Sequence, residues 1–245
     1  MSNQRSPNEI AHGRAVRDMF SGIAGKYDLL NHVLSLNIDK RWRRTVRGKL
    51  SEILGDPSAL VLDVACGTGD LSLELKRNAN ARVMGSDFCH PMLAIAKVKT
   101  DEESESIPYI EGDAMQLPFA DSTFDAVTIA FGLRNLSNFA DGLSELARVL
   151  KPGAKLVVLE FSSPVVPGFR GLFNFYFTKV LPRIGGVVSG SQSAYEYLPE
   201  SVAKFPDQKG LGDLMRSCGF RSVEYTNLTG GIAAIHTGRK VTSDE

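Results

Sequence analysis

Cysteine is rare in this chain of 245 residues, and the chain has no excess of charge of either sign. The three cysteines, Cys66, Cys89 and Cys218, lie far apart and show no CxxC or paired Cys/His spacing, so we expect neither a disulfide framework nor a metal site. The 28 basic side chains equal the 28 acidic ones in number, whereas domains that bind nucleic acid usually carry a clear cationic excess. Nucleic acid is therefore not an expected partner.

Long apolar runs are also missing. The longest run without Asp, Glu, Lys or Arg is Tyr225 to Gly238, which is too short and too polar to span a bilayer, and no signal-peptide core is present. We therefore expect a cytoplasmic protein. Residues 1–50 nevertheless hold ten Lys/Arg against four Asp/Glu, a local charge of +6. A peripheral contact with the inner face of a membrane through these basic N-terminal helices stays open.

Hydrophobic periodicity predicts the fold. Residues 1–13 are polar and expected to be loose, whereas residues 14–50 show the apolar spacing of two or three amphipathic helices. Further on, short apolar runs alternate with helical patterns, which is typical of a mostly parallel sheet covered on both faces. The predicted fold is α/β, a doubly wound seven-stranded sheet closed by an antiparallel pair. The candidate strands are residues 59–65, 82–86, 107–111, 124–131, 155–161, 222–227 and 232–236.

Composition divides the chain into four parts of one domain. Residues 1–50 form a helical cap, residues 51–161 the α/β core, and residues 210–245 the closing strands and a tail. Residues 162–209 break the pattern and are interpreted as an insertion that covers a substrate. That interpretation is based on Pro164, Pro167, Pro182, Pro199 and Pro206 and on the aromatic residues Phe169, Phe173, Phe175, Tyr176 and Phe177.

A glycine-rich turn follows the first predicted strand, at residues 66–70 (CGTGD). A strand that ends in such a turn and opens a helix presents free backbone N–H groups, which suit the anionic part of a nucleotide-like ligand. The dinucleotide fingerprint G-x-G-x-x-G fails at its third glycine, where this chain has Ser72, and the phosphate-loop pattern is absent. NAD and nucleoside triphosphates are therefore disfavoured.

Residues 61–69 (VLDVACGTG) resemble the first motif of class I methyltransferases, a Rossmann-like group that uses S-adenosylmethionine as cofactor. The resemblance makes residues 51–161 a cofactor-binding core in which Gly67, Thr68 and Gly69 face the methionine end. It also implies two roles for Asp63, either contact with the methionine amine or support of the glycine loop, and the sequence does not separate them.

Two acidic positions follow the next strands. The resemblance implies that Asp87 accepts hydrogen bonds from the two ribose hydroxyls, since a carboxylate can take both donors together. The alternative is that Asp87 caps the helix that begins near Pro91. Asp113 and Ala114 correspond to the adenine site, with Asp113 near the exocyclic amine; alternatively, Asp113 only caps a turn.

More specific motifs lie outside the cofactor loop. Together they resemble the C-methyltransferase family of menaquinone and ubiquinone biosynthesis, and the resemblance extends from about His12 to Lys240. It implies an isoprenoid quinol substrate, either demethylmenaquinol or a ubiquinol precursor, and we favour the naphthoquinol. One departure is Ala130, where the family commonly has a serine, so a hydroxyl contact to the cofactor is missing. The motifs are residues 20–44, Gly132 to Asn135, Arg148 to Gly153, Tyr195 to Leu198, and Thr229 to Lys240.

The resemblance places two candidate catalytic residues, Arg134 and Asn135, near the substrate, just past the fourth strand. Because a sulfonium methyl is an electrophile, the acceptor ring must be electron-rich, so the reduced quinol is the expected substrate. Arginine stays protonated at any physiological pH, which favours Arg134 as a stabiliser of the developing phenolate over a literal base. The alternative is that Arg134 pairs with an acidic residue in a loop.

A few further residues have less specific patterns. Tyr27, Tyr195 and Tyr197 are candidates for the acceptor cavity, whereas His236 is expected to be structural. The basic stretch of residues 40–49, with Trp42 at the interface, either contacts anionic lipid or is a solvated helix face. Alternative functions are methylation of another small apolar acceptor and a non-catalytic scaffold that keeps the cofactor fold. The oligomeric state, a homo-oligomer included, stays open.

Overall fold

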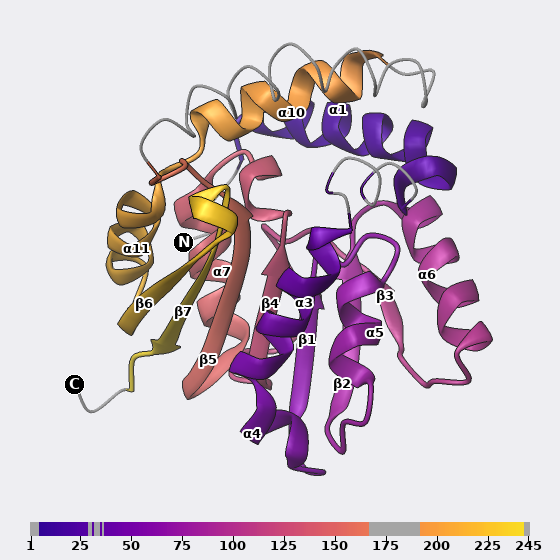
Figure 1. The fold of residues 1–245 in the computed structure, drawn as a ribbon, viewed down its shortest axis with the longest axis vertical. Coiled ribbons are helices and arrows are strands. Elements are labelled where there is room, and N and C mark those ends of the chain that lie inside the picture. Colours follow the sequence, from indigo (N-terminus) through magenta and orange to yellow (C-terminus); the bar gives the residue numbers. More distant parts are fainter. Residues whose placement is uncertain (1–4, 29–30, 32–34, 36, 167–191, 243–245) are drawn as a thin grey trace.

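The structure is a computed structural model that describes residues 5–28, 31, 35, 37–166 and 192–242. Its strands form one sheet in the order β3-β2-β1-β4-β5-β7-β6, in which β7 runs antiparallel to β5 and β6 and the other pairs are parallel (Figure 1). The predicted doubly wound sheet and its antiparallel closing pair are confirmed. The strands are β1 (Leu60–Val64), β2 (Arg82–Asp87), β3 (Tyr109–Glu111), β4 (Phe124–Ala130), β5 (Leu150–Phe161), β6 (Phe220–Leu228) and β7 (Ala233–Lys240).

Helices cover both faces of the sheet and its upper edge in Figure 1. Alternate residues of each central strand enter opposite cores, as the two-residue period of a strand requires. Val61 faces α3, α4 and α5, whereas Leu62 belongs to the core built with α7 and α11. The helices are α1 (Pro7–Ile23), α3 (Ile38–Lys49), α4 (Ser51–Gly55), α5 (Asp70–Lys76), α6 (His90–Glu102), α7 (Phe139–Val149), α10 (Gln192–Lys204) and α11 (Gln208–Ser217).

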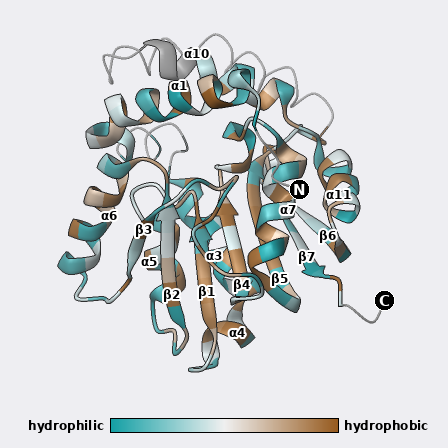
Figure 2. Ribbon diagram, turned by 180° about the vertical axis from the view of Figure 1, so that it is seen from behind, coloured by the Kyte–Doolittle hydropathy of each residue, from teal (hydrophilic) through white to brown (hydrophobic). Residues whose placement is uncertain are grey.

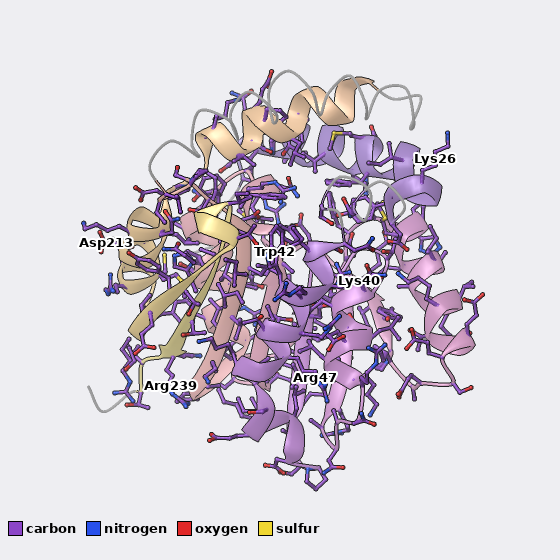
Figure 3. The ribbon with its side chains drawn as sticks, viewed as in Figure 1. Lys26, Lys40, Trp42, Arg47, Asp213 and Arg239 are labelled. Atoms are coloured by element: carbon purple, nitrogen blue, oxygen red, sulfur yellow. The ribbon has the colours of Figure 1, made fainter. Side chains whose placement is uncertain are left out.

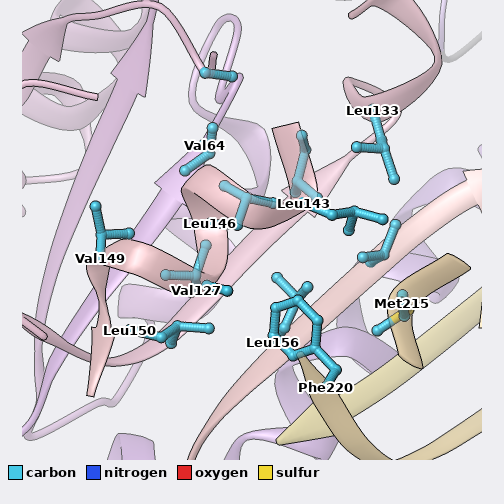
Figure 4. Close-up of a cluster of buried hydrophobic side chains, with 14 of the residues drawn as sticks. Val64, Val127, Leu133, Leu143, Leu146, Val149, Leu150, Leu156, Met215 and Phe220 are labelled. Carbon is cyan, nitrogen blue, oxygen red and sulfur yellow. The ribbon is translucent and has the colours of Figure 1, made fainter. Parts of the chain in front are cut away.

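The second core is the larger of the two. Leu143 and Leu146 of α7 meet Leu156 of β5 and Phe220 of β6 there, and all four side chains are at most 2% exposed (Figure 4). Figure 2 shows the same division, with hydrophobic central strands under helices of mixed hydropathy. This packing makes the parallel strands a rigid frame whose carboxyl ends share one edge.

The helical part of the chain begins earlier than predicted. Residues 7–13, expected to be loose, form the first turns of α1. Ser6 and Glu9 form a capping box, in which the Ser6 hydroxyl accepts from the Glu9 amide and the Glu9 carboxylate accepts from the Ser6 amide. Pro7 occupies the first turn, where its missing N–H costs nothing. These local signals start the helix without an apolar stripe.

The predicted insertion of residues 162–209 lies only partly within the described chain. Its aromatic cluster, residues 169–177, and the side chain of Tyr195 lie outside the described residues. The described part contains α10, a helix that was not predicted and that lies along α1 (Figure 1). A second helix that was not predicted, α11, begins at the last two residues of the insertion and continues to Ser217, and its N-cap Asp207 accepts from the Gly210 amide. The division of the chain into four parts therefore remains a prediction at this insertion.

Glycines are required where the cofactor loop meets the sheet. Gly69 has a φ of +82°, and a Cβ built there would lie 2.7 Å from the Tyr109 hydroxyl oxygen. A side chain at Gly85 of β2 would also meet the Tyr109 ring, at 2.5 Å. Tyr109 therefore packs where the glycine loop and β2 leave room for a ring.

Replacing Gly69 by Ala should lower the free energy of unfolding by at least about 1–2 kcal/mol, because the left-handed backbone and the Tyr109 contact both oppose a methyl group. The control is Gly48→Ala in α3, where nothing lies within 4 Å of the added Cβ. That change should stabilise the protein by up to about 1 kcal/mol. Thermal denaturation measures both, and equal melting temperatures for the two variants would contradict this account.

Candidate functional site

A cavity of about 390 Å³ opens at the carboxyl ends of the parallel strands. Such a volume is within the usual range for small-molecule sites, about 300–1,000 Å³. Its floor is built from residues that follow the strands, and its roof is one face of α1. The floor includes Ala65, Gly67, Asp87, Phe88, Gly112, Asp113, Ala114, Ala130, Phe131, Gly132 and Asn135, and the roof includes Ile10, Gly13, Arg14, Arg17 and Phe20.

The strand ends at this cavity carry an unusual backbone. Ala65 after β1 and Phe131 after β4 both have positive φ, 51° and 56°. Such conformations cost energy and cluster at functional sites. Gly132 permits the close approach of the two ends, since a Cβ there would lie 2.5 Å from the Ala65 Cβ. The packed sheet therefore holds the floor of the cavity in one arrangement.

Asp87 joins the loops after β1 and β2. Its carboxylate accepts from the Gly67 amide at 2.8 Å and from the Cys89 amide at 2.9 Å. Asp87 is only 6% exposed, and burial raises its pKa to about 6 against the opposing effect of these hydrogen bonds. The helix α6 has Cys89 as its N-cap, with no side-chain hydrogen bond, so Asp87 is not that helix's cap. Its place in the cavity wall suits the ribose role.

Asp63 supports the loop from below. Its two carboxylate oxygens accept from the Ser72 hydroxyl at 2.7 Å and the Thr128 hydroxyl at 2.8 Å. The side chain is buried, which raises its pKa to about 7, and it is not among the residues that line the cavity. The geometry favours support over ligand contact. It also explains Ser72, because a glycine there could not hold Asp63.

Thr68 and Gly69 complete the loop beneath a network of charges. Thr68 is buried, and its hydroxyl donates to Asp28 at 2.5 Å. Lys99 of α6 binds both Asp28, at 2.9 Å, and Asp70, the first residue of α5. The N-terminal cap, the glycine loop and α6 are thus joined by polar contacts among residues up to 71 positions apart. Neither Thr68 nor Gly69 lines the cavity itself.

Asp113 and Ala114 line the cavity at the β3 end. Asp113 caps a turn, as the alternative predicted, since one oxygen accepts from the Met115 amide at 2.8 Å. The other oxygen pairs with Arg5 at 2.6 Å. This ion pair links the start of the cap to the side of the floor that follows β3. Arg5 was not predicted as a site residue, because the polar composition of residues 1–13 indicated a loose segment.

Arg134 and Asn135 form a 3-10 turn after β4 with Leu133, and their side chains face different spaces. Asn135 lines the first cavity, whereas Arg134 lines a second cavity of about 350 Å³ beside α10. The Asn135 side-chain oxygen accepts from the Tyr197 hydroxyl at 3.2 Å. The backbone carbonyl oxygen of Asn135 lies 3.1 Å from His12 Nε2. The two cavities adjoin, since both include Glu9, Leu136 and Ser137 in their walls.

The Arg134 guanidinium has an acidic partner in a strand. Its Nη1 lies 2.9 Å from Glu160 at the end of β5 and donates to the Phe131 carbonyl at 2.5 Å. Arg134 is 8% exposed and Glu160 1% exposed. The alternative interpretation, an acidic partner for Arg134, is therefore correct in kind, but the partner is a buried strand residue and not a loop residue. Glu160 could not be identified from the sequence, because no local spacing shows that the end of this strand meets the turn after β4.

Trp42 lies inside the molecule. It is 5% exposed, donates to the Thr229 hydroxyl at 3.0 Å and packs against Phe131 and Phe161. The hypothesis that Trp42 rests at a lipid interface is wrong, because its ring fills the core between α3 and the strand ends. In Figure 3 it lies on the helix that also carries Lys40 and Arg47.

Comparison with known proteins agrees with this geometry. A family model described as the ubiE/COQ5 methyltransferase family matches residues 8–240. This chain belongs to the ubiE/COQ5 methyltransferase family. It is 49% identical to a "Demethylmenaquinone methyltransferase" of Deinococcus radiodurans, and the match covers 93% of each chain. It is 45% identical to a "Ubiquinone/menaquinone biosynthesis C-methyltransferase UbiE" of Geobacter sp. strain M21, with 93% and 97% covered.

A solved structure agrees on the fold. A methyltransferase from Aquifex aeolicus described as SAM-dependent superposes with a TM-score of 0.58 at 21% identity, over 79% of this chain and 88% of the other. The predicted family and fold are confirmed. The predicted enzyme class, an S-adenosylmethionine-dependent methyltransferase, is confirmed with them. The buried Asp87 and the glycine loop beside a cavity of suitable volume fit this cofactor. No described helix is long and apolar enough to cross a membrane.

The ribose role of Asp87 predicts a pH dependence of binding. With a pKa of about 6, the carboxylate loses its charge as the pH falls through that value, and the hydroxyl donors lose their ionic acceptor. Affinity for S-adenosylhomocysteine should therefore fall by up to about tenfold per pH unit below about pH 6.

Calorimetry across this range tests the dependence. Asp87→Asn should bind weakly with little pH dependence, and the exposed Asp56→Asn is the control. If the affinity of Asp87→Asn depended on pH as strongly as that of the wild type, the titrating group would be another one, such as Asp63. That result would contradict the ribose role of Asp87.

Proposed function

We propose that this protein transfers the methyl group of S-adenosylmethionine to a ring carbon of reduced demethylmenaquinol, giving menaquinol. Two relatives named demethylmenaquinone methyltransferase, 49% and 50% identical, support the naphthoquinol as substrate. Other relatives at 44–45% identity carry names that include ubiquinone, so a ubiquinol precursor is the second candidate. The single observation that carries the proposal is the Arg134–Asn135 turn between the two adjoining cavities.

The cofactor is held, in this proposal, by residues of the first cavity. Gly67 supplies a close backbone approach, Asp87 takes the ribose hydroxyls, and Asp113 with Ala114 receives the adenine. When bound, the cofactor supplies an electrophilic methyl group on a positively charged sulphur. Ala130 lies in the same wall. Because it lacks the hydroxyl of the serine that the family commonly has there, backbone groups would make the contact with the cofactor at that point.

Arg134 lowers the cost of forming a phenolate. Burial raises the pKa of the Tyr27 phenol and of the Tyr197 phenol, and in both cases the positive charge of Arg134 opposes that rise. At Tyr197 the negative charge of Glu160 raises the pKa as well, by less than Arg134 lowers it. A quinol hydroxyl in the same region is also a phenol, so the same field favours its ionised form. Charge would then move toward the ring carbon, which would bond to the methyl group as the sulphur–methyl bond breaks and S-adenosylhomocysteine leaves. The ring carbon would then release its proton to water, which restores the aromatic ring. Alignment of the two reactants supplies the largest further contribution, up to about 7–11 kcal/mol in well-oriented systems.

Transfer of isotopically labelled methyl from S-adenosylmethionine tests the substrate. We expect label in the reduced demethylnaphthoquinol and none in the oxidised quinone, because only the reduced ring is electron-rich. A reduced benzoquinol precursor measured in parallel distinguishes the two candidate acceptors. Label in neither quinol, in the presence of measured cofactor binding, would favour a different acceptor or a scaffold.

The role of Arg134 is tested by Arg134→Lys, which keeps the charge and loses the planar fork. We expect turnover to fall by about 10²–10³, the usual cost of losing one positioned donor, while affinity for S-adenosylhomocysteine holds. Arg134→Ala is less informative, because it strands Glu160 in the interior at a cost of about 3–5 kcal/mol. Wild-type turnover in Arg134→Lys would show that the planar fork is not needed, and wild-type turnover in Arg134→Gln, which also removes the charge, would contradict the assignment.

A peripheral membrane contact through the basic helix α3 is part of the proposal. Lys40, Arg41 and Arg44 are exposed, whereas Arg43 pairs with Asp39 and Asp70. Figure 3 shows Lys40 near the end of α3 that is closer to the α1 layer. Anionic lipid attracts such side chains by about 1 kcal/mol each. The isoprenoid tail of the substrate gives a physical reason for working at this surface.

Vesicle flotation tests the contact. The protein should float with anionic vesicles, and changing Lys40, Arg41 and Arg44 together to Gln should reduce the bound fraction. The control removes the same charge elsewhere, at the exposed Lys97, Lys209 and Arg216. Equal flotation of both triple variants would contradict a contact through α3.

A further inference from the structure

A buried carboxylate, Glu160, holds the Arg134 side chain and lies outside the glycine loop and the family-like motifs. It is 1% exposed, at the end of β5, and forms hydrogen bonds with both ends of Arg134. Its oxygens lie 2.9 and 3.2 Å from the guanidinium Nη1, and one accepts from the Arg134 amide at 3.3 Å. It also accepts from the Phe161 amide at 2.8 Å, which ties it to its own strand.

These contacts restrict the guanidinium to one orientation. Nη1 points inward to Glu160 and to the Phe131 carbonyl, and the guanidinium carbon lies 5.3 Å from the centre of the Phe161 ring. Nε is buried and has no hydrogen-bond partner among the described residues. A planar guanidinium held on one side in this way keeps its remaining donors in a fixed direction.

We propose that Glu160 is a positioning residue for methyl transfer, which sets the place and direction of the Arg134 charge against the acceptor hydroxyl. The inference depends on the proposed function, because it assumes that Arg134 stabilises the phenolate. Glu160 is absent from the walls of both cavities, so it acts through Arg134 and does not touch the substrate. A displacement of about 1 Å can cost about 10² in rate when alignment supplies the catalysis.

The chain offers a matched control for this pair. Glu145 of α7 pairs with Arg148 at 2.7 Å and accepts from the Leu117 amide at 2.6 Å, so it combines the same two kinds of contact. It belongs to neither cavity wall. A purely structural role for Glu160 would give both pairs the same response to substitution.

Glu160→Asp is the first test, because it keeps the charge and shortens the side chain by one methylene. We expect kcat to fall by about 10² while the KM for S-adenosylmethionine and the affinity for S-adenosylhomocysteine hold. Glu145→Asp should lower the melting temperature without lowering kcat. Wild-type kcat in a folded Glu160→Asp would overturn the proposal, as would an equal loss of kcat in Glu145→Asp.

A double variant covers the case in which single changes unfold the protein. Glu160→Gln combined with Arg134→Gln removes both buried charges and should recover the melting temperature lost in Glu160→Gln. Its kcat should equal that of Arg134→Gln alone, because Glu160 acts only through Arg134. A further loss of kcat in the double variant would show that Glu160 acts independently and would overturn the proposal.

A readout without turnover separates this inference from the proposed function. Trp42 is the single tryptophan, and its ring centre lies 5.9 Å from that of Phe131 and 6.4 Å from that of Phe161, which both contact the Arg134–Glu160 pair. Its emission should change in Glu160→Asp and not in Glu145→Asp. If the wild type transfers no methyl to any quinol, the proposed function fails; an unchanged emission in Glu160→Asp would then overturn the positioning role as well.

Discussion

The hydrogen bond from the Gly67 amide to the Asp87 carboxylate holds the site together. It joins the loop after β1 to the loop after β2, at the point where both strands reach the shared edge of the sheet. The same carboxylate accepts from Cys89 at the start of α6. One buried side chain therefore sets the positions of a glycine loop, a helix and a candidate ligand contact together.

A buried carboxylate fixes neighbouring groups at three places in this structure: Asp63, Asp87 and Glu160. Asp63 is held by hydroxyl groups, Asp87 by backbone amides and Glu160 by an arginine. Charges at a buried edge interact strongly because water does not screen them well. Of the three, only Asp87 lines the first cavity, where its negative charge suits a ligand that carries a sulfonium, whereas Arg134 lines the second cavity.

The N-terminal cap contributes directly to the site. One face of α1 roofs the first cavity, and polar contacts fasten the cap to strand ends: Arg5 to Asp113, and His12 to the Asn135 carbonyl. The α10 helix lies beside α1 and brings Tyr197 to the same turn. A core of parallel strands binds the cofactor in many proteins; here the added helices shape the space in which an acceptor can lie.

The sequence alone determined the positions of the strands along the chain, the glycine loop, the place of Asp87 at the end of the second strand, and the family. These features depend on local patterns: a two-residue or helical period, a glycine where φ is positive, and motifs read along the chain. Even the start of α1 had a local signal in Ser6, Pro7 and Glu9, which the polar character of residues 1–13 obscured.

Only the tertiary structure decided which distant residues meet. Arg5 and Asp113 are 108 positions apart, and Arg134 and Glu160 are 26 apart in different elements. Trp42 looked like an interfacial residue within a basic stretch, but the packing of α3 on the sheet buries its ring. Such contacts depend on how the helices pack on the sheet and on which charged groups are desolvated. A local spacing along the sequence determines neither.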